Sequence, residues 1–230
     1  MDMAASGSWV HRGSMESRYL RISAIVAVVT AGIVVAYTRL VRPWQMNWGA
    51  TREEVARTLP GDESVPNPTW NATRAVTVSA TPEQIWPWLV QIGWGRAGWY
   101  GYDWADNGMH PSTWKILPEH QSMEIGKDFP MSPATKMYCV AFDEPRWMLW
   151  KGSAKGGTWL WYLDPIDDTH TRLITRMRDR YHWNNPIRLG PQLAVDLFDW
   201  PFMRKCMLGV KARAERMARQ QVADEAAIAV

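Results

Sequence analysis

The chain has 230 residues, of which 47% are hydrophobic and 21% are charged, and its formal net charge is +3. This length accommodates one domain with flanking segments, and the composition is typical of a folded protein. The small charge and the lack of a basic run argue against nucleic-acid binding. The two cysteines, Cys139 and Cys206, match no metal or redox spacing, and the sequence contains no phosphate-binding loop, GxSxG elbow or HExxH helix.

The N-terminal part predicts a disordered start followed by a membrane anchor. Residues 1–21 are mostly small and polar, and we predict them to be disordered. The uncharged run from Ile22 to Thr38, extended by Leu40 and Val41, forms roughly 26 Å of helix against a bilayer core of about 30 Å. We therefore predict a single-pass transmembrane helix over residues 22–41. A cleaved signal peptide is the alternative, although no clear small-x-small cleavage site follows the run.

The side of the membrane stays open because arginines flank the apolar run at both ends. Arginine outnumbers lysine and alanine is abundant, which favours a GC-rich bacterial source and the bacterial inner membrane. Residues 42–70 contain several prolines and predict a linker. Inside it, residues 50–59 predict one short helix, with Thr51 and Glu54 as its capping box.

Residues 71–220 predict the folded domain. Residues 72–79 alternate and are β-branched, which indicates a strand. A helix over residues 81–92 follows, because Thr81, Pro82 and Gln84 form a strong helix start. Four more strands are predicted from alternation and the turn residues between them, over 136–142, 147–151, 158–163 and 171–178. A long amphipathic helix over residues 191–220 ends the domain, and residues 221–230 form an Ala-rich tail that frays.

The segment WPWLVQIGWGRAGWYGYDW at 86–104 contains five tryptophans, two tyrosines and four glycines. Tryptophan supplies a rigid apolar wall with one polar nitrogen, and glycine lets the backbone turn sharply. We interpret the segment as the lining of a cavity. One short helix is expected at its end, over residues 102–107, and another beyond it, over residues 114–117. A Trp-rich core is the alternative.

The ionisable residues near this segment are candidates for acid–base chemistry. Asp103 and Asp106 lie three positions apart and share one face of a helix, and His110, Glu119 and His120 follow. The alternative is that they cap helices or lie in solvated loops. Asp106, His110 and His120 match no compact metal site, so we expect neither a metal nor a cofactor. Arg172, Arg176 and Arg178 alternate on the last strand and are expected to face solvent, with a cavity-facing arginine that holds a carboxylate or phosphate as the alternative.

The sequence resembles the membrane-anchored bacterial branch of the START-like, or SRPBCC, superfamily, which includes polyketide cyclase/dehydrase-like and lipid-transport-like proteins. The resemblance covers about 170 residues. Thr81 to Trp104 is its specific part. It rests on NWGAT at 47–51, LPGD at 59–62, the stretch 73–104, ILPEHQSMEIGKDFPM at 116–131, GTWLWYLDP at 157–165, TRLITRMR at 171–178 and MRKCMLGVKARAE at 203–215.

The resemblance implies an α+β helix-grip fold, in which an antiparallel sheet wraps around the long C-terminal helix and leaves an apolar cavity. It carries over no catalytic motif. We predict a membrane-anchored protein that binds an apolar or amphipathic, lipid- or polyketide-like molecule. The alternatives are a cyclase/dehydrase-type enzyme using Asp103, Asp106 or His110, and an assembly factor docking through its Trp-rich face. The predicted ligand-binding residues are Trp88, Arg96, Trp99, Tyr100, Tyr102, Asp103, Trp104, Trp159, Trp161 and Met177.

Overall fold

The computed structural model describes residues 8–152, 156–181 and 185–228, and the chain divides into two compact units, Met1–Gln45 and Met46–Val230. In the first unit, helix α1 (Ser8–Ala36) continues through a π-helical turn, η1 (Tyr37–Val41), into α2 (Arg42–Met46). One helix, Arg18–Met46, is long and apolar enough to cross a membrane. A signal sequence can have the same length and composition.

Helix α1 begins earlier than the sequence predicted. Residues 8–21, which we expected to be disordered, are helical. Extending a helix adds one hydrogen bond for each residue ordered, so an apolar helix nucleated downstream propagates through a segment that contains no proline. The predicted disorder of residues 1–7 lies outside the described residues.

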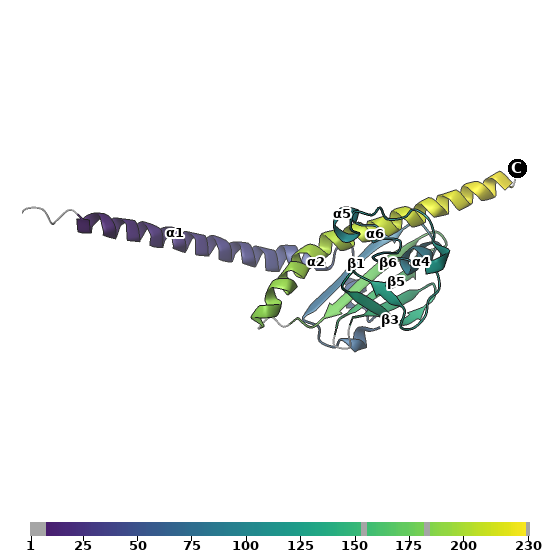
Figure 1. Cartoon of the computed structure of the whole chain (residues 1–230), viewed down its shortest axis with the longest axis horizontal. Helices are drawn as coiled ribbons and strands as arrows, with labels where there is room; N and C mark the ends of the chain where they lie inside the picture. The colour runs from purple at the N-terminus through teal and green to yellow at the C-terminus, as the bar shows by residue number, and fades with distance from the viewer. Residues whose placement is uncertain (1–7, 153–155, 182–184, 229–230) are drawn as a thin grey trace, which may run out of the picture. The chain divides into compact units, whose positions relative to one another are not determined.

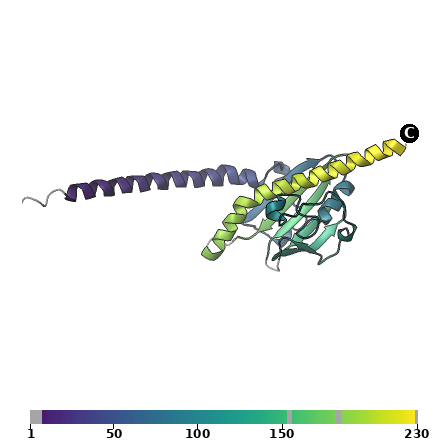
Figure 2. The same ribbon diagram turned by 45° about the horizontal axis from the view of Figure 1, so that its top comes forward.

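The second unit is built on an antiparallel sheet, which in the described part of the chain has six strands. Their order is β1-β6-β5-β4-β3-β2. Figures 1 and 2 show the long helix α6 (Pro186–Ile228) crossing one face of this sheet, with α4 (Pro82–Val90) beside it. This arrangement confirms the α+β helix-grip fold, and an apolar N-terminal helix accompanies it. The strands are β1 (Trp70–Val78), β2 (Asp128–Pro130), β3 (Lys136–Asp143), β4 (Trp147–Lys151), β5 (Thr158–Pro165) and β6 (Thr171–Asp179).

Several boundaries differ from the predicted ones. Residues 114–117 form no helix, and a 3-10 turn, η3 (Pro118–His120), follows them, because the residue before a proline avoids the helical region. Strand β2 was missed, since three residues ending in a proline give no alternating signal. Helix α6 continues through the predicted tail as far as Ile228, where alanine has high helix propensity. The short helices α3 (Arg52–Ala56), η2 (Asp62–Ser64) and α5 (Asp103–Asp106) complete the unit.

The core lies between the sheet and the two helices α4 and α6. Helix α4 begins with the predicted capping box of Thr81 and Gln84 and has a proline at its first position, and its side chains Ile85 and Leu89 are completely buried. Helix α6 contributes residues at helical spacing, which therefore share one face toward the sheet. The buried apolar residues of this face are Met203, Cys206, Met207, Val210 and Ala214.

The predicted linker is largely part of the second unit, because its residues cover the outer face of the sheet. Arg172 donates to Glu54 at 2.7 Å, and Arg176 donates to Asp62 at 2.7 Å. Arg178 also pairs with Asp62, at 2.9 Å. The expectation that these arginines face solvent is therefore corrected: Arg176 is 3% exposed. A buried guanidinium needs a carboxylate partner, and the LPGD motif supplies it.

The same segment protects the free edge of β1. The backbone carbonyl of Trp48 accepts a hydrogen bond from the backbone N–H of Ala75 at 3.1 Å. A Cβ on the next residue, Gly49, would lie 2.2 Å from the carbonyl oxygen of Ala75, so only glycine fits there. An edge strand with unpaired backbone groups invites aggregation, and the NWGAT motif covers part of this edge.

We expect Asp62→Ala to lower the free energy of unfolding by about 3 kcal/mol or more, because it leaves the buried Arg176 guanidinium without its carboxylate. Asp164→Ala is the matched control. Its ion pair with Arg57 is over one-third exposed on the arginine side, so its loss should cost about 1 kcal/mol or less. Chemical denaturation measures both values, and equal effects would contradict the structural role of the LPGD segment.

Candidate functional site

A cavity of about 240 Å³ lies between α6, strands β5 and β6, and the loop that carries the aromatic segment. Its wall is mainly aromatic and sulfur-containing. The polar members, Asp106, Ser132 and Asp199, are few, and among the described residues no lysine, arginine or histidine lines it. The lining comprises Trp94, Trp99, Ala105, Asp106, Met131, Ser132, Trp159, Met177, Asp199, Phe202, Met203 and Cys206.

Two stacked tryptophans form the deep wall of the cavity. Trp99 and Trp159 lie with their ring centroids 5.8 Å apart and their planes 7° apart. Trp159 points inward from β5, and its indole N–H donates to the hydroxyl of Thr175 on β6 at 2.7 Å. This bond satisfies the one polar atom of a ring that is otherwise packed in apolar surroundings, so the wall holds a defined shape.

The loop before Trp99 turns back on itself through glycine. Gly93 and Gly98 form an isolated antiparallel bridge, and Gly98 has a positive φ of 84°. A Cβ on Gly98 would lie 2.3 Å from the hydroxyl oxygen of Ser112. The predicted break of the helix by glycine therefore places Trp99 on a turning backbone that faces the sheet.

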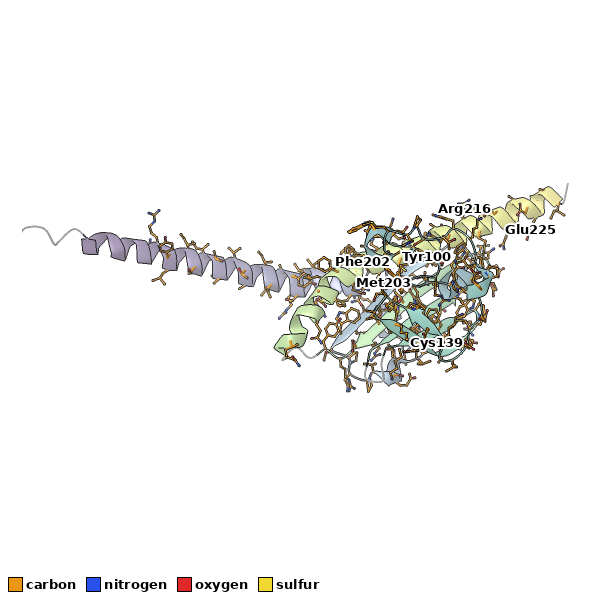
Figure 3. All side chains as sticks on the ribbon, viewed as in Figure 1. Tyr100, Cys139, Phe202, Met203, Arg216 and Glu225 are labelled. Atoms are coloured by element: carbon orange, nitrogen blue, oxygen red, sulfur yellow. The ribbon has the colours of Figure 1, made fainter. Side chains whose placement is uncertain are left out.

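Helix α6 supplies the opposite wall. Figure 3 labels Phe202 and Met203 on this helix, and both side chains line the cavity. The Phe202 ring meets the Tyr102 ring edge-on at 5.5 Å. Burial strongly raises the pKa of the Cys206 thiol, so this side chain stays protonated and acts as a small apolar part of the wall.

Asp106, the last residue of α5, adds a carboxylate to the cavity lining. Its Oδ2 accepts the backbone N–H of Tyr102 at 2.8 Å, and a Cβ on Gly101 would lie 2.2 Å from that oxygen. Its Oδ1 is buried and has no hydrogen-bond partner within the described part of the chain. Burial raises the pKa of Asp106 above its usual value, and the nearby Asp103 carboxylate raises it further.

Asp199 is the second carboxylate on the wall, and it comes from α6. Its Oδ2 forms an ion pair with Arg74 of β1 at 2.6 Å. Burial raises the pKa of Asp199 although Arg74 opposes the shift, and Asp196, one turn earlier, adds to it. Two carboxyl groups with raised pKa values beside an apolar wall can bind a hydrogen-bond donor or transfer a proton.

The structure brings three of the predicted ligand-binding residues together on the cavity wall: Trp99, Trp159 and Met177. Trp161 is fully buried in the core on the same strand as Trp159. Trp104, by contrast, is 72% exposed and points to solvent. The turn of the loop accounts for the difference between Trp99, which lines the cavity, and Trp104, which is exposed.

The other predicted residues hold the loop in place or lie elsewhere. Arg96 donates to the backbone carbonyls of Val90 and Asp128, at 2.9 and 3.2 Å. Asp103 accepts hydrogen bonds from both the backbone N–H and the hydroxyl of Ser112, and so it holds this part of the loop in place. Outside the cavity lining lie Trp88 and Tyr100, which are buried, Tyr102, which is partly buried, and the alternative catalytic residue His110, which is exposed.

Sequence reasoning missed the contribution of α6 to the site. Asp199, Phe202, Met203 and Cys206 all line the cavity. One signal was present, since Asp199 lies one turn before Met203, a residue of the predicted apolar face of this helix. The described residues contain no group of three or more His, Cys, Asp or Glu side chains arranged to hold a metal ion.

The chain matches no protein-family model and no curated protein. Similar solved structures include the Polyketide_cyc-like protein Cgl2372 from Corynebacterium glutamicum, at 15% identity and a TM-score of 0.31, covering 66% of this chain and 87% of that one. The di-domain ARO/CYC protein StfQ from the steffimycin biosynthetic pathway has 15% identity and a TM-score of 0.42, covering 69% and 54%. The Aha1 dimer from Colwellia psychrerythraea has 13% identity and a TM-score of 0.31, covering 57% and 92%. Likeness at this level concerns the SRPBCC-like fold and leaves the ligand open.

We expect Asp106→Asn to raise the melting temperature at pH 7 and to lose this advantage as the pH falls toward 4. The folded-state pKa of Asp106 is raised, so ionisation costs the folded chain stability as the pH rises from the unfolded value of about 3.9 through the higher folded value. Asn removes that cost. Thermal melting across this pH range measures the difference.

Asp103→Asn is the matched control for this experiment. The Asp103 carboxylate accepts two hydrogen bonds from Ser112, and an amide offers one oxygen for them, so this variant should melt at a lower temperature. A lower melting temperature for Asp106→Asn at pH 7 would contradict the assignment of Asp106 as a carboxylate buried at a cost to stability.

Proposed function

We propose that this chain is a membrane-anchored protein that binds a small molecule with an apolar body in the cavity under α6. The single observation that carries this proposal is the composition of the cavity wall, with four aromatic rings and three methionines around a space between sheet and helix. Ligand sites are typically apolar concavities with a few placed polar groups, and this wall has that composition.

The size of the cavity narrows the ligand. Its volume of about 240 Å³ lies below the usual range of roughly 300–1,000 Å³ for pockets that enclose drug-sized ligands. A two-ring aromatic molecule is of suitable size, whereas a lipid with two long chains exceeds it. We therefore favour a compact apolar molecule, or the end of a longer amphipathic one, over a whole membrane lipid or a large polyketide.

The apolar helix supports the anchoring part of the proposal. The stretch Arg18–Met46 is long and apolar enough to span a bilayer, and none of its apolar window is buried inside the protein. A soluble protein that exposed such a helix to water would lose the free energy of burying its apolar side chains. We place the chain in the bacterial inner membrane as a single-pass protein, which keeps an apolar ligand close to the phase in which it dissolves.

A second candidate function is an enzyme of the cyclase/dehydrase type. It is favoured by one observation, the two carboxyl groups with raised pKa values on the cavity wall. A general acid needs such a group beside the substrate. In this candidate Asp106 and Asp199 would act, since Asp103 is bonded to Ser112 and His110 is exposed. Docking through a Trp-rich face has less support, because Trp86, Trp88 and Trp99 are buried.

Filling the cavity should abolish ligand binding without unfolding the protein. Cys206→Phe places a ring in the space that Cys206 lines, and we expect binding of 2-naphthalenemethanol, measured by isothermal titration calorimetry, to fall at least tenfold. Ala223→Phe, at an exposed position of the same helix, is the matched control and should bind normally. Unchanged binding by a folded Cys206→Phe variant would place the ligand elsewhere.

Truncation separates the anchor from the domain. Deleting residues 1–45 should release a folded, soluble chain, because the contacts within Met46–Val230 stay complete. Deleting residues 1–65 should instead give a chain of much lower stability, because it removes the carboxylate partners of Arg172 and Arg176. Membrane fractionation with thermal melting measures both outcomes. Retention of the shorter deletion in carbonate-washed membranes would show that attachment lies outside the N-terminal helix.

A further inference from the structure

We propose that the cavity selects apolar molecules that carry an ammonium group, and that the carboxylate of Asp106 binds this group. This inference rests on the proposed ligand-binding function and specifies its ligand class. It follows from three observations: the charge of the cavity wall, one carboxylate oxygen that accepts no hydrogen bond, and the aromatic rings around it.

The charge of the wall is negative. Asp106 and Asp199 are the charged residues of the lining within the described part of the chain. The charge of Asp199 is offset by Arg74, at 2.6 Å on the neighbouring strand β1. Asp106 receives a backbone N–H from Tyr102 at 2.8 Å and faces a second carboxylate, Asp103, which adds negative potential. The uncompensated charge of the cavity is therefore that of Asp106.

One oxygen of this carboxylate lacks a hydrogen-bond donor within the described residues. Oδ2 of Asp106 is held by the Tyr102 N–H, whereas Oδ1 is buried without a protein donor within the described residues. A buried carboxylate oxygen without a donor costs free energy that a ligand donor recovers. A hydrogen bond between two charged groups is about twice as strong as one between neutral groups, so an ammonium satisfies this oxygen better than a hydroxyl does.

The rest of the wall also favours a cation over an anion. Trp94, Trp99, Trp159 and Phe202 line the same space, and the faces of aromatic rings attract cations electrostatically. The methionine sulfurs of the lining are polarizable and carry no hydrogen-bond donor. An anionic ligand would meet the uncompensated carboxylate of Asp106 and, within the described lining, no lysine, arginine or histidine, so an acid should bind weakly even when its apolar body fits.

A matched set of three probes tests the selectivity: 2-naphthylmethylamine, 2-naphthalenemethanol and 2-naphthoic acid. They share one bicyclic body and differ in the head group. Binding to the full-length chain in lipid nanodiscs is measured by isothermal titration calorimetry near pH 7, with empty nanodiscs as the blank for partitioning. We expect the amine to bind at least tenfold more tightly than the alcohol, and the acid to bind more weakly than both.

Two variants assign the selectivity to Asp106. Asp106→Asn should weaken the amine at least tenfold and change the alcohol less than about threefold, while the exposed Asp143→Asn, with the same change of charge, should behave as the wild type. Ala105→Lys adds a cation at an exposed position of the lining and should turn the preference toward the acid. This second variant keeps the test valid if Asp106→Asn fails to fold.

The outcomes separate the two proposals. If none of the three probes binds the wild-type chain, the ligand-binding function itself fails. If the probes bind but the amine has no advantage over the acid, or if a folded Asp106→Asn variant retains the amine preference, the ligand-binding function stands and the ammonium inference is overturned.

Discussion

The close packing of α6 on the aromatic loop at Gly209 is the contact on which the site depends. A Cβ at Gly209 would lie 2.1 Å from the carbonyl oxygen of Tyr100, so the helix and the loop backbone touch directly. One turn later, the Arg213 guanidinium lies between the rings of Tyr100 and Trp114, at 4.1 and 4.2 Å, and it donates to the carbonyl of Thr113 at 2.7 Å. This clamp sets the distance between the helix wall and the loop wall of the cavity.

Tyr100 also binds the loop to α4 on its other side. Its hydroxyl donates to the carbonyl of Trp88 at 3.1 Å and accepts from the side chain of Gln91 at 2.8 Å. Burial raises the pKa of this phenol, so it stays a neutral donor. Tyr100 has a positive φ of 57°, a backbone conformation that side chains other than glycine adopt at a cost, and these contacts hold it there. Trp99, its neighbour, is positioned by the same constraint.

The site combines a buried carboxylate that lowers stability with surrounding arginines whose charges are paired. Asp106 places a carboxylate in apolar surroundings, whereas Arg74, Arg172 and Arg176 each have a carboxylate partner within 2.7 Å. Proteins retain groups that lower stability mainly where function needs them. The buried charges around the cavity therefore have partners, whereas one oxygen of Asp106, a residue of the cavity wall, has none within the described residues.

The sequence by itself determined the elements whose signals are local. The capping boxes of Thr51 and Thr81, the strand at 147–151 and the glycine break after Ile92 depend on residues a few positions apart, and the structure has each of them. Tertiary structure decided which rings face the cavity and which carboxylates join them. Trp159 and Trp161 lie two positions apart on β5 and therefore point to the same face of the sheet. Of the two, Trp159 lines the cavity and Trp161 does not. Asp106 and Asp199 meet the same cavity from segments more than ninety positions apart, and no local pattern encodes a surface formed by the packing of distant elements.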